Sequence, residues 1–201
     1  KLVYRGDCLR QACLNGKDME LFDILTPDGK PTGIVKERSI VHTGGDLHGT
    51  SHIWLVRRKQ HGFDVLLQKR SKEKDAFPGC YDVSSAGHMA VGDDYLHTAV
   101  RELSEELGVT AEPEDFKFIG MRDSVVKDTF HGKPFHNHEL SAVYVYETDL
   151  SEEKFRLQKE EVDSVLWMDF REFEEKARNG GIRHCIFADE IKMLGEFMGC
   201  K

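Results

Sequence analysis

Residues 101–108 read Arg-Glu-Leu-Ser-Glu-Glu-Leu-Gly and end a helix that the sequence predicts over 93–107. Apolar residues recur there at i, i+3 and i+4, as on the buried stripe of an amphipathic helix. Asp93 and Asp94 offer an N-cap and negative charge at the helix start, and Gly108 stands where a helix ends. The apolar stripe consists of Leu96, Ala99, Val100, Leu103 and Leu107.

Three glutamates share one face of this helix. At about 100° per residue, Glu102, Glu105 and Glu106 fall within roughly 100° of one another. Like charges at this spacing repel by roughly a few tenths of a kcal/mol per pair. A hard divalent cation offsets the repulsion, and Mg²⁺ prefers oxygen ligands, with water and substrate phosphate completing its shell. A solvated acidic face is the alternative interpretation of these residues taken alone.

A longer pattern favours the metal site. Gly87 is followed by five residues, Asp93, seven residues and then the segment 101–109. This spacing resembles the motif of the Nudix hydrolase family, which is a Gly, five residues, a Glu, seven residues and then Arg-Glu-aliphatic-any-Glu-Glu-any-Gly-aliphatic. Asp93 is the one departure. It keeps the carboxylate, at a position that in the family mainly braces the loop and helix.

The resemblance implies an α/β fold, an α/β/α sandwich with a mixed sheet, and metal-dependent hydrolysis of a diphosphate linkage. Carried over by position, Glu102, Glu105 and Glu106 hold Mg²⁺ or Mn²⁺, and the Gly87 carbonyl adds a ligand. Arg101 pairs with a helix carboxylate, and the expected catalytic residues are Glu105, Glu106 and Arg101. Such metals neutralise the diphosphate and lower the pKa of bound water, and a nearby carboxylate takes the proton.

Residues 66–79 and 84–88 narrow the resemblance to the branch that contains isopentenyl-diphosphate isomerase and its hydrolase relatives. The resemblance to this branch extends over about residues 19–170. In that branch Arg70 and Lys74 match positions that grip the diphosphate, and two cations flanking a turn suit phosphate binding by charge-assisted hydrogen bonds. An ordinary basic surface loop is the alternative.

Isomerisation of a prenyl diphosphate is the competing activity. The isomerases move protons with a Cys directly before a Gly-His pair, and Ala86 occupies that position here. One of their two acidic metal ligands falls on Asn137. The other isomerase metal ligands match His88, Glu139 and, at a shortened spacing, His42 and His48. The sequence therefore favours hydrolysis, with Glu139 as an expected further metal ligand.

Two more hypotheses concern binding. A catalytically silent Nudix domain is one, and the intact trio of glutamates counts against it. The other is a transition-metal site formed by His131, His136 and His138 with Glu139, but the spacing fits no standard zinc pattern. We interpret 131–138 as a polar loop that enters a strand at the mouth of the site.

Composition limits the class of partner. The 201 residues carry a formal net charge of −8 and 39% hydrophobic residues, as in soluble globular proteins. Nucleic-acid binders usually have a basic patch, so we expect a small-molecule diphosphate and no nucleic acid. No apolar run approaches the ~20 residues that span a bilayer, so no membrane partner is expected. Five cysteines without a CxxC pair indicate reduced thiols and a cytoplasmic location.

The chain divides into an N-terminal extension of unknown role, residues 1–18, and a Nudix domain, residues 19–201. A homodimer is expected, because the family often forms one. The remaining predicted elements are strands at 19–25, 32–35, 51–56, 63–68, 140–146 and 165–167, and helices at 170–178 and 188–198.

Overall fold

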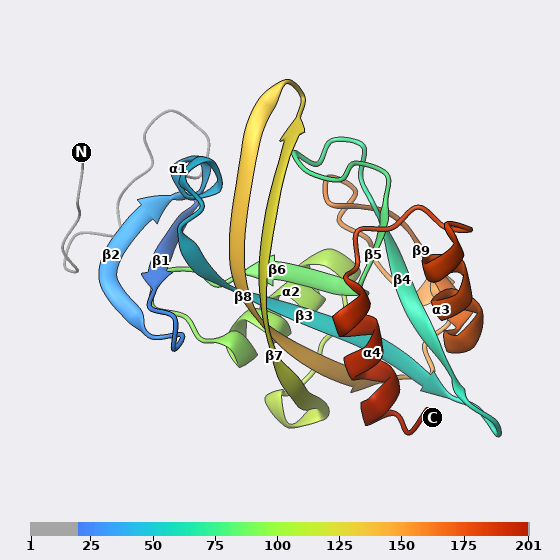
Figure 1. The fold of residues 1–201 in the computed structure, drawn as a ribbon. Helices are drawn as coiled ribbons and strands as arrows, with labels where there is room; N and C mark the ends of the chain where they lie inside the picture. The colour runs from blue at the N-terminus through green and yellow to red at the C-terminus, as the bar shows by residue number, and fades with distance from the viewer. Residues whose placement is uncertain (1–19, 201) are drawn as a thin grey trace.

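The computed structural model describes residues 20–200 and centres on a seven-stranded mixed sheet (Figure 1). The strand order is β5-β4-β3-β8-β7, with β6 paired to β3 and β9 paired to β4. The central pair, β3 and β8, is parallel, and the other pairs are antiparallel. The strands are β3 (Leu47–Arg58), β4 (Phe63–Arg70), β5 (Tyr81–Asp82), β6 (Ser85–His88), β7 (Phe116–Phe130), β8 (Lys133–Glu147) and β9 (Val162–Asp169).

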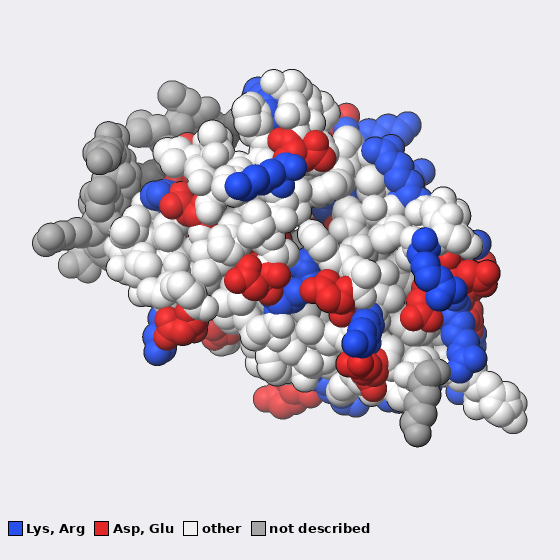
Figure 2. All heavy atoms as spheres, in the orientation of Figure 1, with Lys and Arg blue, Asp and Glu red and all other residues white. Residues whose placement is uncertain are grey.

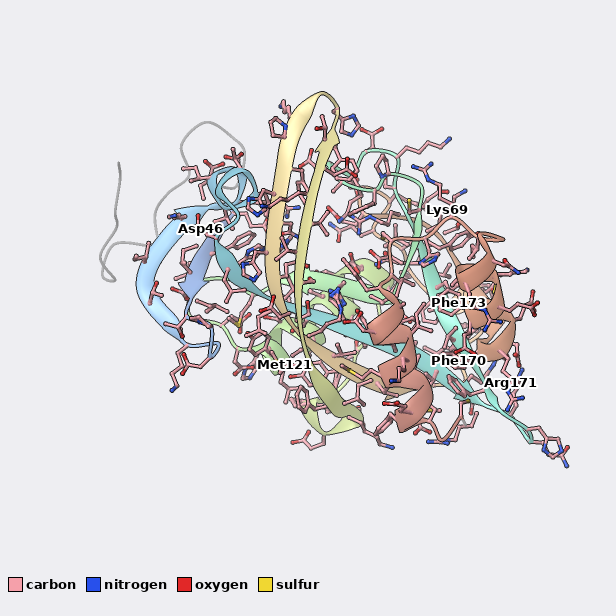
Figure 3. All side chains as sticks on the ribbon, viewed as in Figure 1. Asp46, Lys69, Met121, Phe170, Arg171 and Phe173 are labelled. Carbon is pink, nitrogen blue, oxygen red and sulfur yellow. The ribbon has the colours of Figure 1, made fainter. Side chains whose placement is uncertain are left out.

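Helices cover both faces of this sheet. The helix α2 (Tyr95–Leu107) packs Leu103 and Leu107 against Ile53 of β3. Alternate strand residues point to opposite faces, so Trp54 faces the other way, toward α3 (Phe170–Asn179) and α4 (Ala188–Phe197). The labelled Phe170 and Phe173 reach from α3 toward the sheet (Figure 3). The α/β/α sandwich expected from the sequence is confirmed.

A small second sheet lies beside the parallel pair. It consists of β1 (Leu21–Leu25) and β2 (Pro31–Glu37), and is followed by the short helix α1 (Arg38–Gly44), which the sequence did not predict. Phe22 of β1 is fully buried and stacks on two histidine rings of the main sheet, 5.1 Å from His48 and 4.6 Å from His88. The second sheet therefore closes one end of the site. Two 3₁₀ helices complete the fold, η1 (Pro113–Asp115) and η2 (Glu152–Lys154).

The prediction of a polar loop over 131–138 is wrong. β7 and β8 form a long hairpin, and only the turn at His131 and Gly132 separates them. The far end of the hairpin projects beyond the other strands (Figure 1). Because many side chains there are exposed on both faces, the alternation of apolar and polar residues that marks a half-buried strand is missing.

The three histidines of that segment have separate partners. His131 contacts the carbonyl of Lys74, and His138 Nε2 lies 2.9 Å from Asp123 Oδ1. His136 packs over Gly45, where a Cβ would lie 2.3 Å from the ring. The structure therefore gives no support to a joint metal site for them. The expected extension 1–18 lies outside the described residues.

Candidate active site

One cavity of about 300 Å³ gathers the residues that the sequence singled out. It opens where α2, β6, the 71–80 loop and the base of the β7–β8 hairpin meet. The predicted site residues that line it are Arg70, Lys74, Gly87, Arg101, Glu102, Glu105, Glu106 and Glu139. Residues 69 positions apart in the chain thus share one chamber.

Glu106 is the most buried member of the glutamate face, at 3% exposure. Its Oε2 accepts hydrogen bonds from Ser85 Oγ at 2.7 Å and from the Ala86 backbone N–H at 3.1 Å. Burial nevertheless dominates and raises the pKa of Glu106 to about 7. The side chain is therefore held in one position against β6, in surroundings that favour its charged form only when a cation is close.

Arg101 links the other two glutamates to β6. Its Nη1 lies 2.6 Å from Glu102 Oε1 and 3.1 Å from Glu105 Oε2, and its Nη2 donates to the His88 carbonyl at 3.0 Å. This is the pairing with a helix carboxylate that the motif implies for Arg101. One guanidinium thus fixes the rotation of the helix relative to the strand.

The helix start is also braced. Asp94 is the N-cap of α2 and accepts from the His97 N–H at 2.9 Å, so the helix begins two residues later than predicted. Asp93 accepts from Thr98 Oγ1 at 3.2 Å and from the Asp94 N–H at 3.0 Å. The shorter carboxylate at position 93 therefore still ties the loop to the first turn of the helix.

The donor set on this face fits a hard divalent cation. Glu102, Glu105 and Glu106 supply carboxylate oxygens at the cavity wall, and Gly87 adds backbone there. Burial raises the pKa of Glu102 against the opposing effect of Arg101. Oxygen-only ligands that are partly withdrawn from water suit Mg²⁺ or Mn²⁺ rather than a thiophilic metal.

A second group of ligands adjoins the same cavity, whose lining includes His42 and His88. Ligand nitrogens of His42, His48 and His88 lie within 4.8 Å of one another, and His42 Nε2 is 3.3 Å from His48 Nε2. Burial lowers the pKa of both His42 and His88 to about 3. The imidazoles are therefore neutral at physiological pH, which is the state that binds metal.

Glu139 belongs with these histidines. Its Oε1 is 3.5 Å from His88 Nε2 and 4.0 Å from His48 Nε2. Burial opposes its ionisation, but the His88 contact outweighs it and holds the pKa of Glu139 below its usual range. The shortened spacing of His42 and His48 had weakened the sequence match. Helix α1 removes that difficulty, because it turns His42 back toward β3.

The two predicted diphosphate ligands are already engaged. Arg70 donates from Nη1 to Asp82 at 2.8 Å and from Nε and Nη2 to the Ala76 carbonyl at 3.2 and 3.0 Å. Lys74 forms an ion pair with Glu161. Both side chains line the cavity. Arg70, however, already uses its donors to hold Asp82 and the loop that carries Lys74. The sequence alone did not indicate this bracing role.

Several lining residues escaped the sequence reasoning. Cys185 brings a thiol to the cavity, whereas Cys80 is buried and does not line it. Burial raises the pKa of the Cys185 thiol well above its usual value. The other additions lie on the α4 side of the sheet and are His52, Arg122, Phe187 and Glu190. The available signal for His52 was its even spacing from His48 on one strand.

Comparison with known proteins agrees with this geometry. The NUDIX domain model matches residues 47–187, well over half of the chain. The chain belongs to the Nudix family. Within the family, it is 42% identical over 159 residues to Nudix hydrolase 3 of Arabidopsis thaliana, a match that covers 77% of this chain and 20% of that protein. The chain thus spans about a fifth of the length of that relative.

Other Nudix proteins match over more of their length. An uncharacterized Nudix hydrolase of Clostridium acetobutylicum is 35% identical over 159 residues, which cover 79% of this chain and 73% of that protein. An isopentenyl-diphosphate Delta-isomerase of Cutibacterium acnes is 28% identical over 160 residues, which cover 78% and 77%. The resemblance to the branch with isomerases and hydrolases is confirmed.

The fold has solved counterparts. The crystal structure of DR0079 from Deinococcus radiodurans superposes with a TM-score of 0.66 at 16% identity, covering 86% of this chain and 98% of that one. Within residues 20–200, no helix is long and apolar enough to cross a bilayer. On the face drawn in Figure 2, acidic and basic side chains lie beside one another.

Proposed function

We propose that this Nudix domain hydrolyses a diphosphate linkage in a small phosphorylated metabolite, with a nucleoside diphosphate as one candidate. The observation that carries the proposal is the set of three glutamates at one cavity wall, with Glu106 buried and Glu102 packed on Gly87. Mg²⁺ or Mn²⁺, held by the glutamates and the Gly87 carbonyl, would neutralise the diphosphate and acidify a bound water.

The chain's own residues supply positioning and a proton acceptor. Glu105 is 53% exposed at its side chain and reaches the cavity, while Arg101 holds one of its oxygens. Glu106 is fixed against β6 and has a pKa of about 7. One of these two carboxylates takes the proton from the attacking water, since a general base works best with a pKa near the operating pH. Lys74 lies within the cavity to meet the phosphate charge.

Glu139 is assigned to a separate metal site with His42, His48 and His88. Neutral imidazoles with one carboxylate suit a borderline ion such as Zn²⁺. The test is metal analysis after dialysis against Zn²⁺. We expect His42→Ala to lower the bound Zn²⁺, whereas His97→Ala, which removes an exposed histidine outside the cavity, leaves it unchanged. Equal Zn²⁺ content in both variants would contradict the proposal that these histidines bind Zn²⁺.

The runner-up activity is isomerisation of a prenyl diphosphate. The histidine cluster favours it, because that cluster corresponds to the isomerase metal ligands. Ala86 opposes it, because the cavity holds a methyl group where the isomerases have their thiol. Incubation with isopentenyl diphosphate and Mg²⁺ in deuterated water separates the two reactions. We expect no deuterium in dimethylallyl diphosphate. Incorporation at an enzyme-like rate would show that the protein is an isomerase.

The main test is a screen of phosphorylated compounds with Mg²⁺ that measures released phosphate and diphosphate separately. We expect cleavage of at least one diphosphate compound by the wild type, and cleavage at least ~100-fold slower by Glu106→Gln. Cleavage of phosphomonoesters alone would contradict the proposal. The homodimer and the cytoplasmic location stay predictions, which size-exclusion chromatography with light scattering and cell fractionation would test.

A further inference from the structure

A buried polar network lies on the α4 side of the sheet, within the same cavity. Glu190 of α4 is 1% exposed and accepts from Trp54 Nε1 at 3.1 Å, while His52 Nδ1 lies 3.0 Å from both of its oxygens. Arg122 of β7 places Nε 3.4 Å from Glu190 Oε2. A single carboxylate therefore faces two potential cations. The exposed Asp189 lies farther out, at 3.7 Å from the Arg122 Nε.

Arg122 is the unusual member of this network. Its side chain is only 3% exposed, yet the buried Nε and Nη1 have no hydrogen-bond partner among the described residues. Buried guanidinium donors without partners are costly, and a native protein seldom leaves them so unless something else pairs with them. The guanidinium packs 4.0 Å over the ring of Phe187, which shields one of its faces. Arg122 also lines the cavity, so its unpartnered donors are buried directly beside that space.

The buried members of the network, Arg122, His52 and Glu190, carry a net positive charge when His52 is protonated. The only other carboxylate paired with Arg122 among the described residues is the exposed Asp189. Burial opposes protonation of His52, but Glu190 outweighs it and raises the pKa of His52 to about 9. At neutral pH two cations thus share the one buried carboxylate. The excess charge in surroundings of low polarity attracts an anion more strongly than it would at the surface.

Strand register brings Arg122 and His52 of this network to the same part of the sheet. Arg122 lies opposite Ser141 of β8, which lies beside Thr50 of β3, and His52 follows two residues along that strand. These residues share one face of the sheet, and α4 covers its lower part (Figure 1). Glu102, Glu105 and Arg122 all line the one cavity, which connects this network to the glutamate face.

We propose that Arg122, His52 and Phe187 form a subsite for an anionic group, a phosphomonoester or a carboxylate, carried by the organic part of the substrate. The proposal rests on the proposed function, in that the diphosphate occupies the glutamate end of the cavity. Arg122 donates from its free N–H groups to the anion, His52 adds charge, and Glu190 with Trp54 positions both. The substrate class is thus a diphosphate compound with a further acidic group.

The two tryptophans of the chain provide a local probe that needs no turnover. The Trp54 indole N–H donates to Glu190, whereas the Trp167 indole donates to the Leu150 carbonyl, outside the cavity. The ¹H–¹⁵N spectrum of the metal-free protein in EDTA is titrated with inorganic phosphate and, separately, with acetate. Trp167→Phe assigns the two indole signals. We expect a saturable shift of the Trp54 signal and none of Trp167.

Variants of Arg122 test whether that shift reports the subsite. We expect Arg122→Met to abolish the saturable shift, and Arg122→Lys, which keeps the charge beside Glu190, to weaken the affinity for phosphate at least ~3-fold, since Lys lacks the planar fork. The control is Arg58→Met, which removes an exposed guanidinium paired with Glu147, and should titrate like the wild type. The ligand that binds more tightly, phosphate or acetate, identifies the acidic group.

The outcomes separate this proposal from the hydrolase proposal. An unmoved Trp54 signal with both anions, or an unchanged titration in a folded Arg122→Met or Arg122→Lys variant, would overturn the subsite even if the enzyme cleaves diphosphates. A titration that depends on Arg122 would uphold anion binding even if the compound screen released no phosphate. A purely structural Arg122 would lower thermal stability and leave the titration as it is.

Discussion

The backbone of Gly87 lies directly against the carboxylate of Glu102. A Cβ at position 87 would come within 1.9 Å of Glu102 Cδ and 2.1 Å of Oε1, far inside van der Waals contact. Gly87 is not among the glycines with positive φ. The site therefore needs glycine here for steric room rather than for backbone freedom, and the close approach sets the position of a predicted metal ligand.

Gly87→Ala should displace the Glu102 carboxylate and lower kcat at least ~100-fold, the scale of losing a positioned catalytic group. The measurement is steady-state kinetics alongside circular dichroism and thermal melting. Gly62→Ala is the matched control. Gly62 has φ +78° with nothing within 4 Å, so alanine there should cost about 1 kcal/mol of stability and leave kcat unchanged. Full activity of Gly87→Ala would show that catalysis does not need Glu102 in this position.

Turnover should depend strictly on a divalent cation, because three carboxylates of α2 face the cavity and only two of them, Glu102 and Glu105, are paired with Arg101. Exhaustive EDTA treatment should abolish activity, and Mg²⁺ or Mn²⁺ should restore it. The circular dichroism spectrum should not change, since the packing of α2 relies on its apolar stripe. Undiminished activity in EDTA would contradict the metal site.

Glu105→Gln and Glu106→Gln should each lower kcat at least ~100-fold, the scale of losing a metal ligand or a general base. The fold should survive both changes. Glu106 has a raised pKa, so a neutral amide replaces a group that burial already disfavours as an anion, and the amide oxygen can still accept from Ser85. Glu174→Gln, which removes an exposed charge of α3, serves as the control. An active Glu106→Gln enzyme would place the chemistry elsewhere.

Arg70 and Lys74 should differ in their effects. Lys74→Ala should raise KM more than it lowers kcat, because the amine would meet a phosphate already in the ground state. Arg70→Ala should also destabilise the fold by roughly 3 kcal/mol, since it leaves the half-buried Asp82 and the Ala76 carbonyl unpaired. For a domain of this size, that lowers Tm by about 6–12 °C. Calorimetry and kinetics of both variants distinguish positioning from binding, and equal melting temperatures would contradict the bracing role.

Stability should fall as the pH rises through the titration of His52. Its pKa in the folded state is about 9, against 6.5 as the reference for the unfolded chain. Protonated His52 therefore stabilises the fold fully below about pH 6.5, and this stabilisation is lost between about pH 6.5 and 9. Thermal melts over this window should show a decline that is shallower in His52→Gln. If the melting temperatures of the wild type and of His52→Gln fall in parallel with pH, His52 does not cause the pH dependence.

The sequence by itself determined the helix that ends at Leu107, its buried stripe and the carboxylate face next to it. These are local properties, since side chains three and four residues apart in a helix meet whatever the rest of the chain does. The core strands β3, β4 and β8 were predictable for a related reason, because burial selects apolar and β-branched residues. The sequence did not predict β7 or the first residues of β8, because the projecting end of this hairpin buries neither face consistently.

Tertiary structure alone decided which distant residues meet. His48 and Glu139 lie opposite each other only because β3 and β8 pair in parallel in that register, and α1 brings His42 to them. The same holds for Arg122 and Glu190, which contact each other across β7 and α4. For His48 and Glu139 only the family resemblance gave a signal, and for Arg122 and Glu190 there was none. The residues alone cannot decide such pairs, because a one-residue shift in register would turn each side chain to the other face of the sheet.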